Sequence, residues 1–264
     1  MKRTFQLVAL TACLALTLGC SATGKRDSFT FTADLPKDFF YVATVYYKPA
    51  AGQTCTVAPR QNLAKEFNRH WRTEYKLDSQ IDLYRTINGC EMALHRVSLS
   101  IKATYGEDYG DMSSDFGGIA VRNWTNDKYK GTFNAQGDGE FFGRCQWLFR
   151  TIGKKRYITK ILNCLNTDSQ GVQFGARPFA AYTLEELAGR TIRLKIKLAE
   201  EEEPYMGDTW IKLPNGWKRC MGDNFEDQDA FCLGNYKNFS TFKMPDGRIC
   251  TVYPNCTETN EVSP

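Results

Sequence analysis

Eight cysteines between residues 55 and 256 constrain the fold of this chain more than any other feature. The chain contains ten cysteines and two histidines. Cys13 and Cys20 lie in an apolar N-terminal segment, and the other eight are Cys55, Cys90, Cys145, Cys164, Cys220, Cys232, Cys250 and Cys256. These eight show no Cys-x-x-Cys spacing, so the pattern does not indicate a structural zinc site. In an oxidising compartment, an even set of spaced cysteines predicts four disulfides.

The N-terminal segment indicates export into such a compartment. Lys2 and Arg3 precede an apolar run from Phe5 to Leu18. Positive residues followed by an apolar run too short to span a bilayer are typical of a secretory signal, which is removed from the mature protein. We therefore exclude this segment from the fold and expect the rest of the chain to form disulfides.

The end of the segment, Leu16-Thr17-Leu18-Gly19-Cys20, resembles the lipobox of bacterial lipoproteins. In that family the cysteine receives a diacylglyceryl thioether and becomes the new N-terminus. The resemblance implies a signal peptide over residues 1–19, lipidation of Cys20 and stable attachment to a membrane through the acyl chains. Ser21, which stands where Asp would retain an enterobacterial lipoprotein, implies an outer-membrane protein that faces the periplasm. A competing cut after Ala22 would instead release a soluble protein.

Length and charge limit the size of the mature fold and the classes of partner that it can bind. Cleavage before Cys20 removes 19 of the 264 residues and leaves 245, enough for one large β domain or two smaller ones. Without Lys2 and Arg3 the chain carries 32 basic and 30 acidic residues, a net charge of +2. A surface that neutralises phosphates needs a large excess of positive charge, so we expect no nucleic-acid partner.

Alternating apolar and polar residues predict an all-β fold. Residues 20–28 are few and polar and form the expected tether. Several runs between residues 29 and 199 alternate with period two and are bounded by turn residues. The clearest are 39–47, 81–87, 95–103 and 190–198. This pattern predicts an antiparallel β-sandwich-like domain over residues 29–199.

The segment from Phe141 to Leu165 is the clearest hairpin, and its register predicts a disulfide. With a four-residue loop at residues 153–156, Cys145 lies directly opposite Cys164. One strand face then carries both cysteines and most of the apolar side chains, which favours a Cys145–Cys164 bond.

Cys55 and Cys90 form the second expected pair. Cys90 lies at the turn between two alternating runs, which we expect to be neighbouring antiparallel strands. It is near enough along the chain to tie down the loop that carries Cys55.

Residues 204–257 form the expected disulfide-rich C-terminal β-hairpin subdomain. An acidic run closed by Pro204 precedes the segment, and turn signals occur at 214–216 and 245–247. So short a segment buries too little apolar surface alone, so we expect disulfides to staple it and the preceding domain to hold it. Its cysteines fit either adjacent pairing, Cys220–Cys232 with Cys250–Cys256, or nested pairing, Cys220–Cys256 with Cys232–Cys250.

Three further segments have recognisable local patterns. Residues 105–118 are rich in Gly, Asp, Ser and Glu without a periodic apolar face, which predicts a long surface loop and a candidate binding element. Residues 61–75 fit either a short amphipathic helix or an irregular loop. Residues 183–189 carry a Thr-x-x-Glu capping pattern and a terminal Gly, which predicts a single helical turn.

We predict no catalytic residues, no cofactor, no metal site and no enzymatic activity. His70 lies in a charged stretch and is expected on the surface, whereas His95 shares the apolar face of a strand and is expected to be partly buried. The chain lacks Gly-x-Ser-x-Gly and His-Glu-x-x-His, the local signatures of serine hydrolases and zincins. Residues 134–140 alternate oxygen-bearing side chains with glycine, but a polar turn is favoured over a calcium loop.

Three tryptophans beside polar residues, Trp124, Trp210 and Trp217, are the candidate binding residues. Exposed tryptophans anchor protein partners or stack on sugar rings. We expect the chain to bind a protein partner at the cell envelope. One specific version, which rests on analogy with small anchored binders, is immunity to an antibacterial toxin that arrives in the periplasm. The alternatives are a glycan- or peptidoglycan-binding module and an envelope hydrolase.

Overall fold

The chain folds into two large β-sheets and one small one. The structure is a computed structural model that describes residues 27–57, 63–67, 78–123, 128–222 and 230–256, with the backbone alone for 63–67. The fold is all-β and rich in disulfides, as the sequence predicts. The predicted signal peptide, Cys20, His70 and Trp124 lie outside the described residues. Within the described ranges, no helix is long and apolar enough to cross a membrane.

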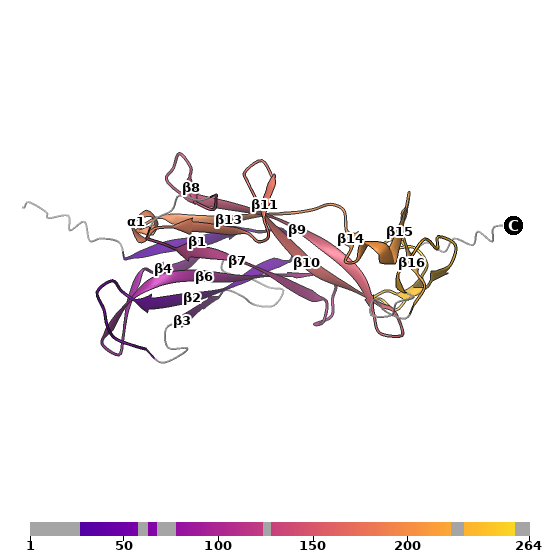
Figure 1. The fold of residues 1–264 in the computed structure, drawn as a ribbon, viewed down its shortest axis with the longest axis horizontal. Coiled ribbons are helices and arrows are strands. Elements are labelled where there is room, and N and C mark those ends of the chain that lie inside the picture. The colour runs from indigo at the N-terminus through magenta and orange to yellow at the C-terminus, as the bar shows by residue number, and fades with distance from the viewer. Residues whose placement is uncertain (1–26, 58–62, 68–77, 124–127, 223–229, 257–264) are drawn as a thin grey trace, which may run out of the picture.

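The larger sheet has the order β19-β18-β10-β9-β13-β1-β4, with β8, β11 and β14 paired at its sides (Figure 1). Its strands are β1 (Ser28–Asp34), β4 (Ser79–Asp82), β8 (Thr132–Phe133), β9 (Gly139–Ile152), β10 (Tyr157–Thr167), β11 (Gln173–Gly175), β13 (Thr191–Leu198), β14 (Glu203–Pro204), β18 (Phe242–Lys243) and β19 (Ile249–Cys250). β9 runs through both parts of this sheet. Near its N-terminal end it pairs with β8 and β13, and farther along it pairs with β10 and β14.

The second large sheet has the order β12-β7-β6-β2-β3, with β5 beside β6. Its strands are β2 (Phe39–Pro49), β3 (Leu63–Phe67), β5 (Tyr84–Ile87), β6 (Cys90–Thr104), β7 (Met112–Val121) and β12 (Phe179–Tyr182). The small sheet contains β15 (Trp210–Leu213), β16 (Gly216–Cys220) and β17 (Phe239–Ser240). Two short helices, α1 (Leu184–Leu187) and the 3-10 helix η1 (Gly207–Thr209), complete the described elements.

The main hydrophobic core lies between the two large sheets. Alternate side chains of β1, β2, β6, β9 and β13 point into it, and Phe31, Leu99 and Leu194 are fully buried there. This arrangement is the sandwich that the alternating pattern predicts, because each strand buries one face and exposes the other.

Parallel strand pairs are the feature of the sandwich that the sequence pattern did not indicate. β1 pairs in parallel with β13, and β13 in parallel with β9. In the other sheet β12 lies parallel to β7. The period-two pattern shows which face of a strand is buried, but it does not show which distant strand lies beside it.

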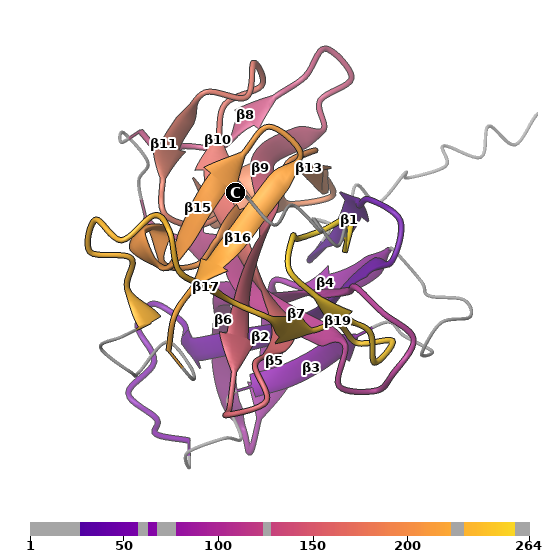
Figure 2. The same cartoon turned by 90° about the vertical axis from the view of Figure 1, so that its right-hand side faces the viewer.

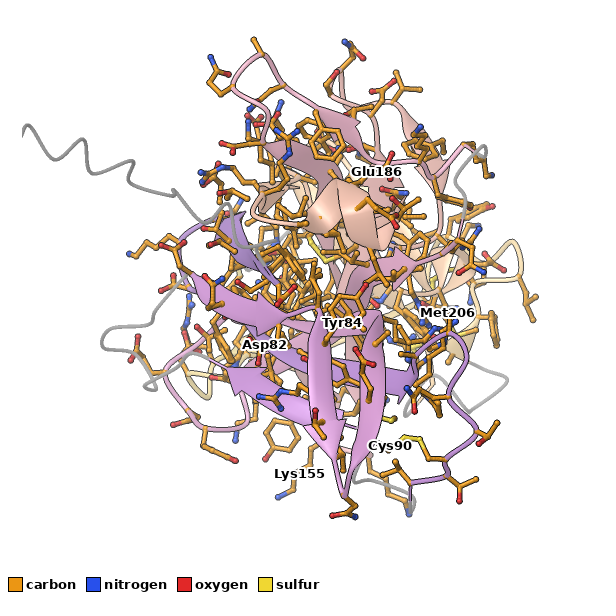
Figure 3. The ribbon with its side chains drawn as sticks, turned by 90° about the vertical axis from the view of Figure 1, so that its left-hand side faces the viewer. Asp82, Tyr84, Cys90, Lys155, Glu186 and Met206 are labelled. Atoms are coloured by element: carbon orange, nitrogen blue, oxygen red, sulfur yellow. A yellow bond between two sulfur atoms is a disulfide. The ribbon has the colours of Figure 1, made fainter. Side chains whose placement is uncertain are left out.

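The disulfides of the sandwich follow the predicted pairing. Cys145 lies opposite Cys164 in the β9–β10 ladder, and the two are joined. Cys55 is joined to Cys90, which begins β6 at the turn after β5. Figure 3 views this end of the molecule, with Cys90 near the turn of the β5–β6 hairpin and Asp82 and Tyr84 at the bend from β4 into β5.

Only the first half of the predicted surface loop at residues 105–118 is a loop, and the second half is a strand, which corrects the prediction. The loop ends at Asp111, and β7 begins at Met112. Ser113 Oγ accepts from the backbone N–H of Leu162 at 3.0 Å, and Asp115 Oδ2 accepts from the N–H of Cys164 at 2.6 Å. Ser113 and Asp115 therefore join the sheet of β7 to β10 of the other sheet, so these two side chains have a structural role.

The sequence also predicts the local structure of residues 61–75 and 183–189. Within residues 61–75, the part that the structure describes is the edge strand β3, which pairs with β2. The helical turn at residues 183–189 is present as α1, and Thr183 and Glu186 form the predicted capping box.

His95 is exposed, contrary to the partly buried position expected for it. Tyr46 pairs with Arg96 and Tyr47 with Leu94, so His95 is the extra residue of a β-bulge. The bulge breaks the alternation and turns the side chain outward. Its remaining burial and the charges of Lys48 and Arg96 lower the pKa of His95, which favours the neutral imidazole.

A second core joins the C-terminal residues to the sandwich. Phe149 of β9 and Ile158 of β10 pack against Trp210, Phe242 and Tyr253. The disulfides here are the adjacent pairs, Cys220–Cys232 and Cys250–Cys256, so the nested alternative is wrong. β18 also extends the larger sheet by pairing with β10.

The two cores lie at opposite ends of the long axis of the molecule. The described chain begins at the end that carries α1, whereas β15 to β19 lie at the other end (Figures 1 and 2). The strand register agrees, because Phe31 is level with Ile192 and Ile192 with Gly139 at the start of β9. From Gly139 to Ile152, β9 extends for roughly 40 Å at the usual rise per residue.

Buried tyrosines predict that the protein loses stability in alkaline solution. Burial and the nearby Asp78 raise the pKa of Tyr41 to about 12, although the hydrogen bond with Ser79 opposes the rise. An unfolded chain releases this proton near pH 10 (the ordinary tyrosine pKa), so its stabilising effect is complete below about pH 10 and is lost as the pH rises to about 12. We expect the free energy of unfolding, measured with urea, to fall between about pH 9 and about pH 11.

The variant Tyr41→Phe should show a smaller fall over the same pH interval. Some dependence should remain, because burial also raises the pKa of Tyr182 and Tyr253. Tyr109→Phe is the control, since Tyr109 is 81% exposed and its replacement should leave the pH profile unchanged. An identical profile for Tyr41→Phe and the unaltered protein would contradict the assignment.

Candidate functional site

A cavity opens where β9 changes its neighbour in the larger sheet. β10 pairs with β9 as far as Thr167 opposite Phe142, and β8 takes its place at Thr132 opposite Glu140. The gap between β8 and β10 leads into a cavity of about 620 Å³, which we call the sheet-gap pocket. Its volume lies within the range of small-ligand sites. The pocket is lined by Lys128, Tyr129, Lys130, Gly131, Thr132, Phe133, Asn134, Glu140, Phe141, Phe142, Asn166, Thr167, Asp168, Ser169, Phe174, Phe179 and Ala180.

Aromatic side chains form much of the wall. The ring of Tyr129 lies 6.0 Å from that of Phe174 and 5.6 Å from that of Phe179, measured between centroids. Glycine at position 131 leaves room for the neighbouring Tyr182, since a Cβ there would collide with the tyrosine ring. The result is an apolar surface that can hold a flat or apolar group.

The lining of the pocket carries two basic residues, Lys128 and Lys130, and two acidic ones, Glu140 and Asp168. Glu140 accepts from Lys195 at 2.6 Å, and Lys130 lies 3.6 Å from Glu186. Lys128 Nζ donates to the carbonyl of Phe174 at 3.3 Å. No strong excess charge of either sign is left to attract an ionic ligand.

Two turns hold the rim of the pocket in a fixed shape. Asn134 Oδ1 accepts from the backbone N–H groups of Gln136 and Asp138, at 3.0 and 2.9 Å. These contacts make residues 134–140 the polar turn that the sequence favours over a calcium loop. Asp168 Oδ1 accepts in the same way from the N–H groups of Gln170 and Val172.

Asn166 lines the pocket and carries a buried acceptor without a partner among the described residues. Its side chain is 1% exposed, and its Nδ2 donates to the carbonyl of Phe179 at 3.2 Å. Its Oδ1 has no partner among the described residues. The nearby Tyr182 hydroxyl is also buried without a partner in the described chain. Burial and the charges of Glu186 and Glu140 raise the pKa of Tyr182, so the hydroxyl stays protonated.

Of the three tryptophans chosen from the sequence, the two that the structure describes pack against the second core. Trp210 is 3% exposed in the second core, which overturns its assignment as a candidate binding residue. Trp217 is half-buried against the same core, and its ring lies 5.9 Å from that of Phe149. Trp124 lies outside the described residues. Polar neighbours in sequence misled the prediction, because adjacent residues of a strand point to opposite faces.

A second surface lies at the far end of the larger sheet. Ile152 pairs with Tyr157, Tyr157 with Lys243 and Lys243 with Ile249, across β9, β10, β18 and β19. Directly paired residues share one face of a sheet, so these four form a line, which we call the apolar row. Ile152 is 40% exposed, Tyr157 38% and Ile249 64%. Lys243 Nζ lies 5.2 Å from the centre of the Tyr157 ring.

Basic residues border the apolar row. Lys154 and Lys155 are exposed in the loop that joins β9 to β10, directly after Ile152. The sheet face that carries the row is the opposite one from the second core, which takes Phe149, Ile158 and Phe242. The row is therefore an apolar surface with a positive margin, supported from behind by a packed core.

Metal-ligating side chains do not cluster in the part of the chain that the structure describes. No group of three or more His, Cys, Asp and Glu is placed to hold a metal ion in the described part of the chain. His95 lies on β6, in the other large sheet from β8 to β11, and does not line the pocket.

Sequence reasoning located one of these surfaces in part. The hairpin register that pairs Cys145 with Cys164 also pairs Ile152 with Tyr157. The pairing of two of the four residues of the apolar row therefore follows from the sequence. The sheet-gap pocket combines segments from residues 128–142 and 166–180, and no local pattern signals that they meet. Comparison of the chain with protein-family models, with curated proteins and with solved structures finds no match.

Proposed function

We propose that this chain is an exported, lipid-anchored envelope protein that acts by binding a protein partner. The lipobox-like segment ending at Cys20 supports the anchor. The four disulfides among the described residues suit an oxidising compartment such as the periplasm. By the lipoprotein resemblance, attachment is to the outer membrane, with the fold facing the periplasm.

The apolar row is the observation that carries the binding proposal. Three large apolar side chains exposed in one line are characteristic of an interaction surface rather than of scattered surface residues. The row lies at the end of β9 remote from the start of β1, as the view with the long axis horizontal shows (Figure 1). An anchor upstream of β1 would thus hold the other end of the molecule near the membrane and present the row to a partner.

The chemistry of the row indicates the kind of partner. Tyr157 and Ile249 would fill apolar recesses, and Tyr157 is a residue type common in binding hot spots. Lys154, Lys155 and Lys243 favour an acidic rim around those recesses. An antibacterial toxin with such a surface is the specific version that we propose, by analogy with small anchored immunity proteins.

The experiment is a quantitative co-purification from cells that produce the chain at its native level. The double variant Tyr157→Ala/Ile249→Ala should lose a stoichiometric partner, because removing two central apolar anchors weakens binding by about tenfold or more. Tyr109→Ala/Val172→Ala is the matched control, since both residues are exposed apolar side chains outside the row. Equal recovery of the partner with the two double variants would contradict the proposal.

Charge reversal separates the contribution of the basic residues to binding from that of the apolar side chains. Lys154→Glu/Lys155→Glu should slow association with an acidic partner and weaken the dependence of the association rate on salt.

The lipid anchor is tested by metabolic labelling with palmitate. Label should attach to the unaltered chain and not to Cys20→Ala, and processing without any label would place the protein free in the periplasm.

A further inference from the structure

We infer that the interface proposed above extends from the apolar row along the outer face of the β9–β10 hairpin to a carboxylate-binding site formed by Arg144 and Lys197. In this site an acidic side chain of the protein partner lies between the two cations. This extension rests on the proposed function, because the hairpin face continues the apolar row. It identifies residues that select an acidic partner.

The hairpin face follows the two paired strands away from the apolar row. Alternate residues of a strand share one side, and directly paired residues share it too. Starting from the row, the pairs on this side are Ile152–Tyr157, Arg150–Thr159, Leu148–Ile161, Gln146–Asn163 and Arg144–Leu165. Leu148, Ile161 and Leu165 are half-buried, so part of each apolar side chain still reaches solvent. From Ile152 to Arg144 the face spans roughly 26 Å at the usual rise per residue of a strand.

Arg144 and Lys197 form a pair of cations at the end of this face. They lie directly opposite each other in the parallel β9–β13 ladder, and both side chains are exposed. The preceding basic residues on the same side of β13, Arg193 and Lys195, each pair with a carboxylate, at 3.0 and 2.6 Å. The ion pairs formed among the described residues do not include Arg144 or Lys197. Like charges directly opposite each other destabilise a sheet, so a carboxylate bound between them relieves the repulsion.

The charge of the whole face favours an acidic partner. Basic residues border it at both ends, Lys154, Lys155 and Lys243 at the apolar row and Arg144 with Lys197 at the other. Glu203 of β14, opposite Leu148, is an acidic residue beside the face. The excess of basic residues suits carboxylates at the two ends of the partner surface, with apolar side chains between them.

Fluorescence anisotropy with the full mature chain tests this arrangement. The probe is a labelled random copolymer of glutamate and tyrosine, which carries both the carboxylates and the apolar side chains expected of the partner. It should bind at low salt, and Arg144→Ala/Lys197→Ala should weaken that binding by about fivefold, the effect of losing two exposed ion pairs. Polyglutamate, which lacks the rings, should bind more weakly than the copolymer. Equal affinity for the two polymers would overturn the inference of a mixed apolar and acidic partner surface.

Lys48→Ala/Arg96→Ala is the matched control. It removes one exposed lysine and one exposed arginine from β2 and β6 of the other large sheet, so the net charge falls by the same amount. The control should bind the copolymer about as tightly as the unaltered chain does. Equal weakening in the two double variants, or no binding by the unaltered chain, would overturn the inference.

Lys197→Glu separates a binding role from a structural one. The variant places an acid opposite Arg144 and removes the like-charge repulsion, so it should raise the midpoint of urea unfolding while it weakens copolymer binding. A lower midpoint together with unchanged binding would give the two cations a structural role and overturn the inference.

Failure of the carboxylate site and failure of the proposed function give different results. The proposed function fails if Tyr157→Ala/Ile249→Ala retains its partner in the co-purification. The carboxylate site alone fails if Tyr157→Ala/Ile249→Ala loses affinity for the copolymer and Arg144→Ala/Lys197→Ala keeps it.

Discussion

Replacement of Arg219 by leucine should lower the free energy of unfolding by about 3–5 kcal/mol. Arg219 is 1% exposed, yet its guanidinium contacts several fixed acceptors. Its Nε donates to Thr151 Oγ1 at 2.9 Å, and its Nη1 donates to the carbonyls of Cys220 and Ala230 at 2.8 and 2.9 Å. Leucine would leave these buried acceptors without their donor, and each such loss costs about 1–3 kcal/mol.

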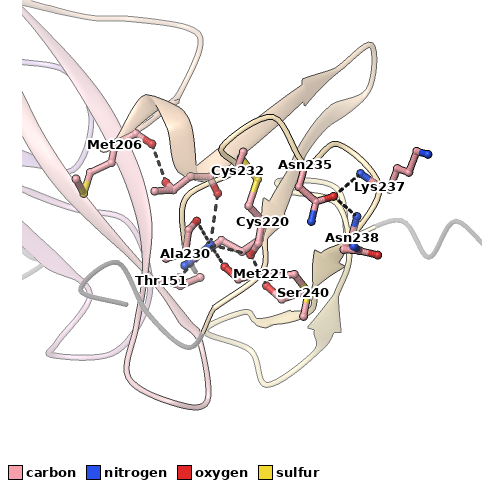
Figure 4. The surroundings of a disulfide bond; sticks show 12 residues. Thr151, Met206, Cys220, Met221, Ala230, Cys232, Asn235, Lys237, Asn238 and Ser240 are labelled. Carbon is pink, nitrogen blue, oxygen red and sulfur yellow. Dashed lines mark hydrogen bonds between the residues drawn. A yellow bond between two sulfur atoms is a disulfide. The ribbon is translucent and has the colours of Figure 1, made fainter. Parts of the chain in front are cut away.

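The position of Arg219 explains why the effect should spread. Thr151 belongs to β9, whereas Cys220 and Ala230 belong to the C-terminal part of the chain, next to the Cys220–Cys232 disulfide (Figure 4). One side chain thus holds three separate segments together. Arg219→Lys should also destabilise the protein, because an ammonium group cannot reproduce the fork of guanidinium donors.

Urea unfolding followed by circular dichroism measures the loss. Arg248→Leu is the matched control, since Arg248 is an exposed arginine of the same region that pairs with Asp246. Exposed ion pairs contribute little, so the control should leave the free energy of unfolding nearly unchanged. Equal stability of the two leucine variants would show that the buried contacts of Arg219 are not essential.

Replacement of Phe149 by alanine should cost about 3–5 kcal/mol and loosen the C-terminal residues first. Phe149 is fully buried, and it extends from β9 into the second core. Its ring centroid lies 4.2 Å from that of Tyr253 and 4.9 Å from that of Trp210. The truncation would leave a cavity at the point where the sandwich holds the C-terminal residues.

Limited proteolysis with mass spectrometry, combined with urea unfolding, tests this expectation. Cleavage should appear first between residues 205 and 256 in Phe149→Ala, while the sandwich stays protected by its own core. Phe116→Ala is the control, because Phe116 is 48% exposed and its loss should leave both measurements nearly unchanged. Uniform destabilisation of both regions would indicate one cooperative unit instead.

The pairing of Tyr253 with Glu202 adds a polar contact to the same junction. Tyr253 donates to Glu202, and Glu202 accepts from Lys160 of β10 at 2.6 Å. Glu202 belongs to the acidic run that the sequence marks as a boundary. It therefore helps to hold the C-terminal residues against the larger sheet. The burial of Tyr253 and the adjacent carboxylate raise its pKa, so the contact keeps its proton.

Features set by neighbouring residues were predictable from the sequence. The all-β character follows from the period-two alternation, and the Cys145–Cys164 pair follows from one hairpin register. The capping box of α1 depends on Thr183 and Glu186 alone. In these cases the interacting groups are close along the chain, so the local pattern contains the information that fixes their geometry.

Features that depend on distant segments were decided by the tertiary structure. The parallel pairing of β1 with β13 and of β13 with β9 leaves no trace in either strand's own pattern. The bulge that exposes His95, the burial of Trp210 and the cavity between β8 and β10 follow from how whole sheets pack. A strand's alternation records which face avoids water, but the partner on that face is chosen by the shape and closure of the complete core.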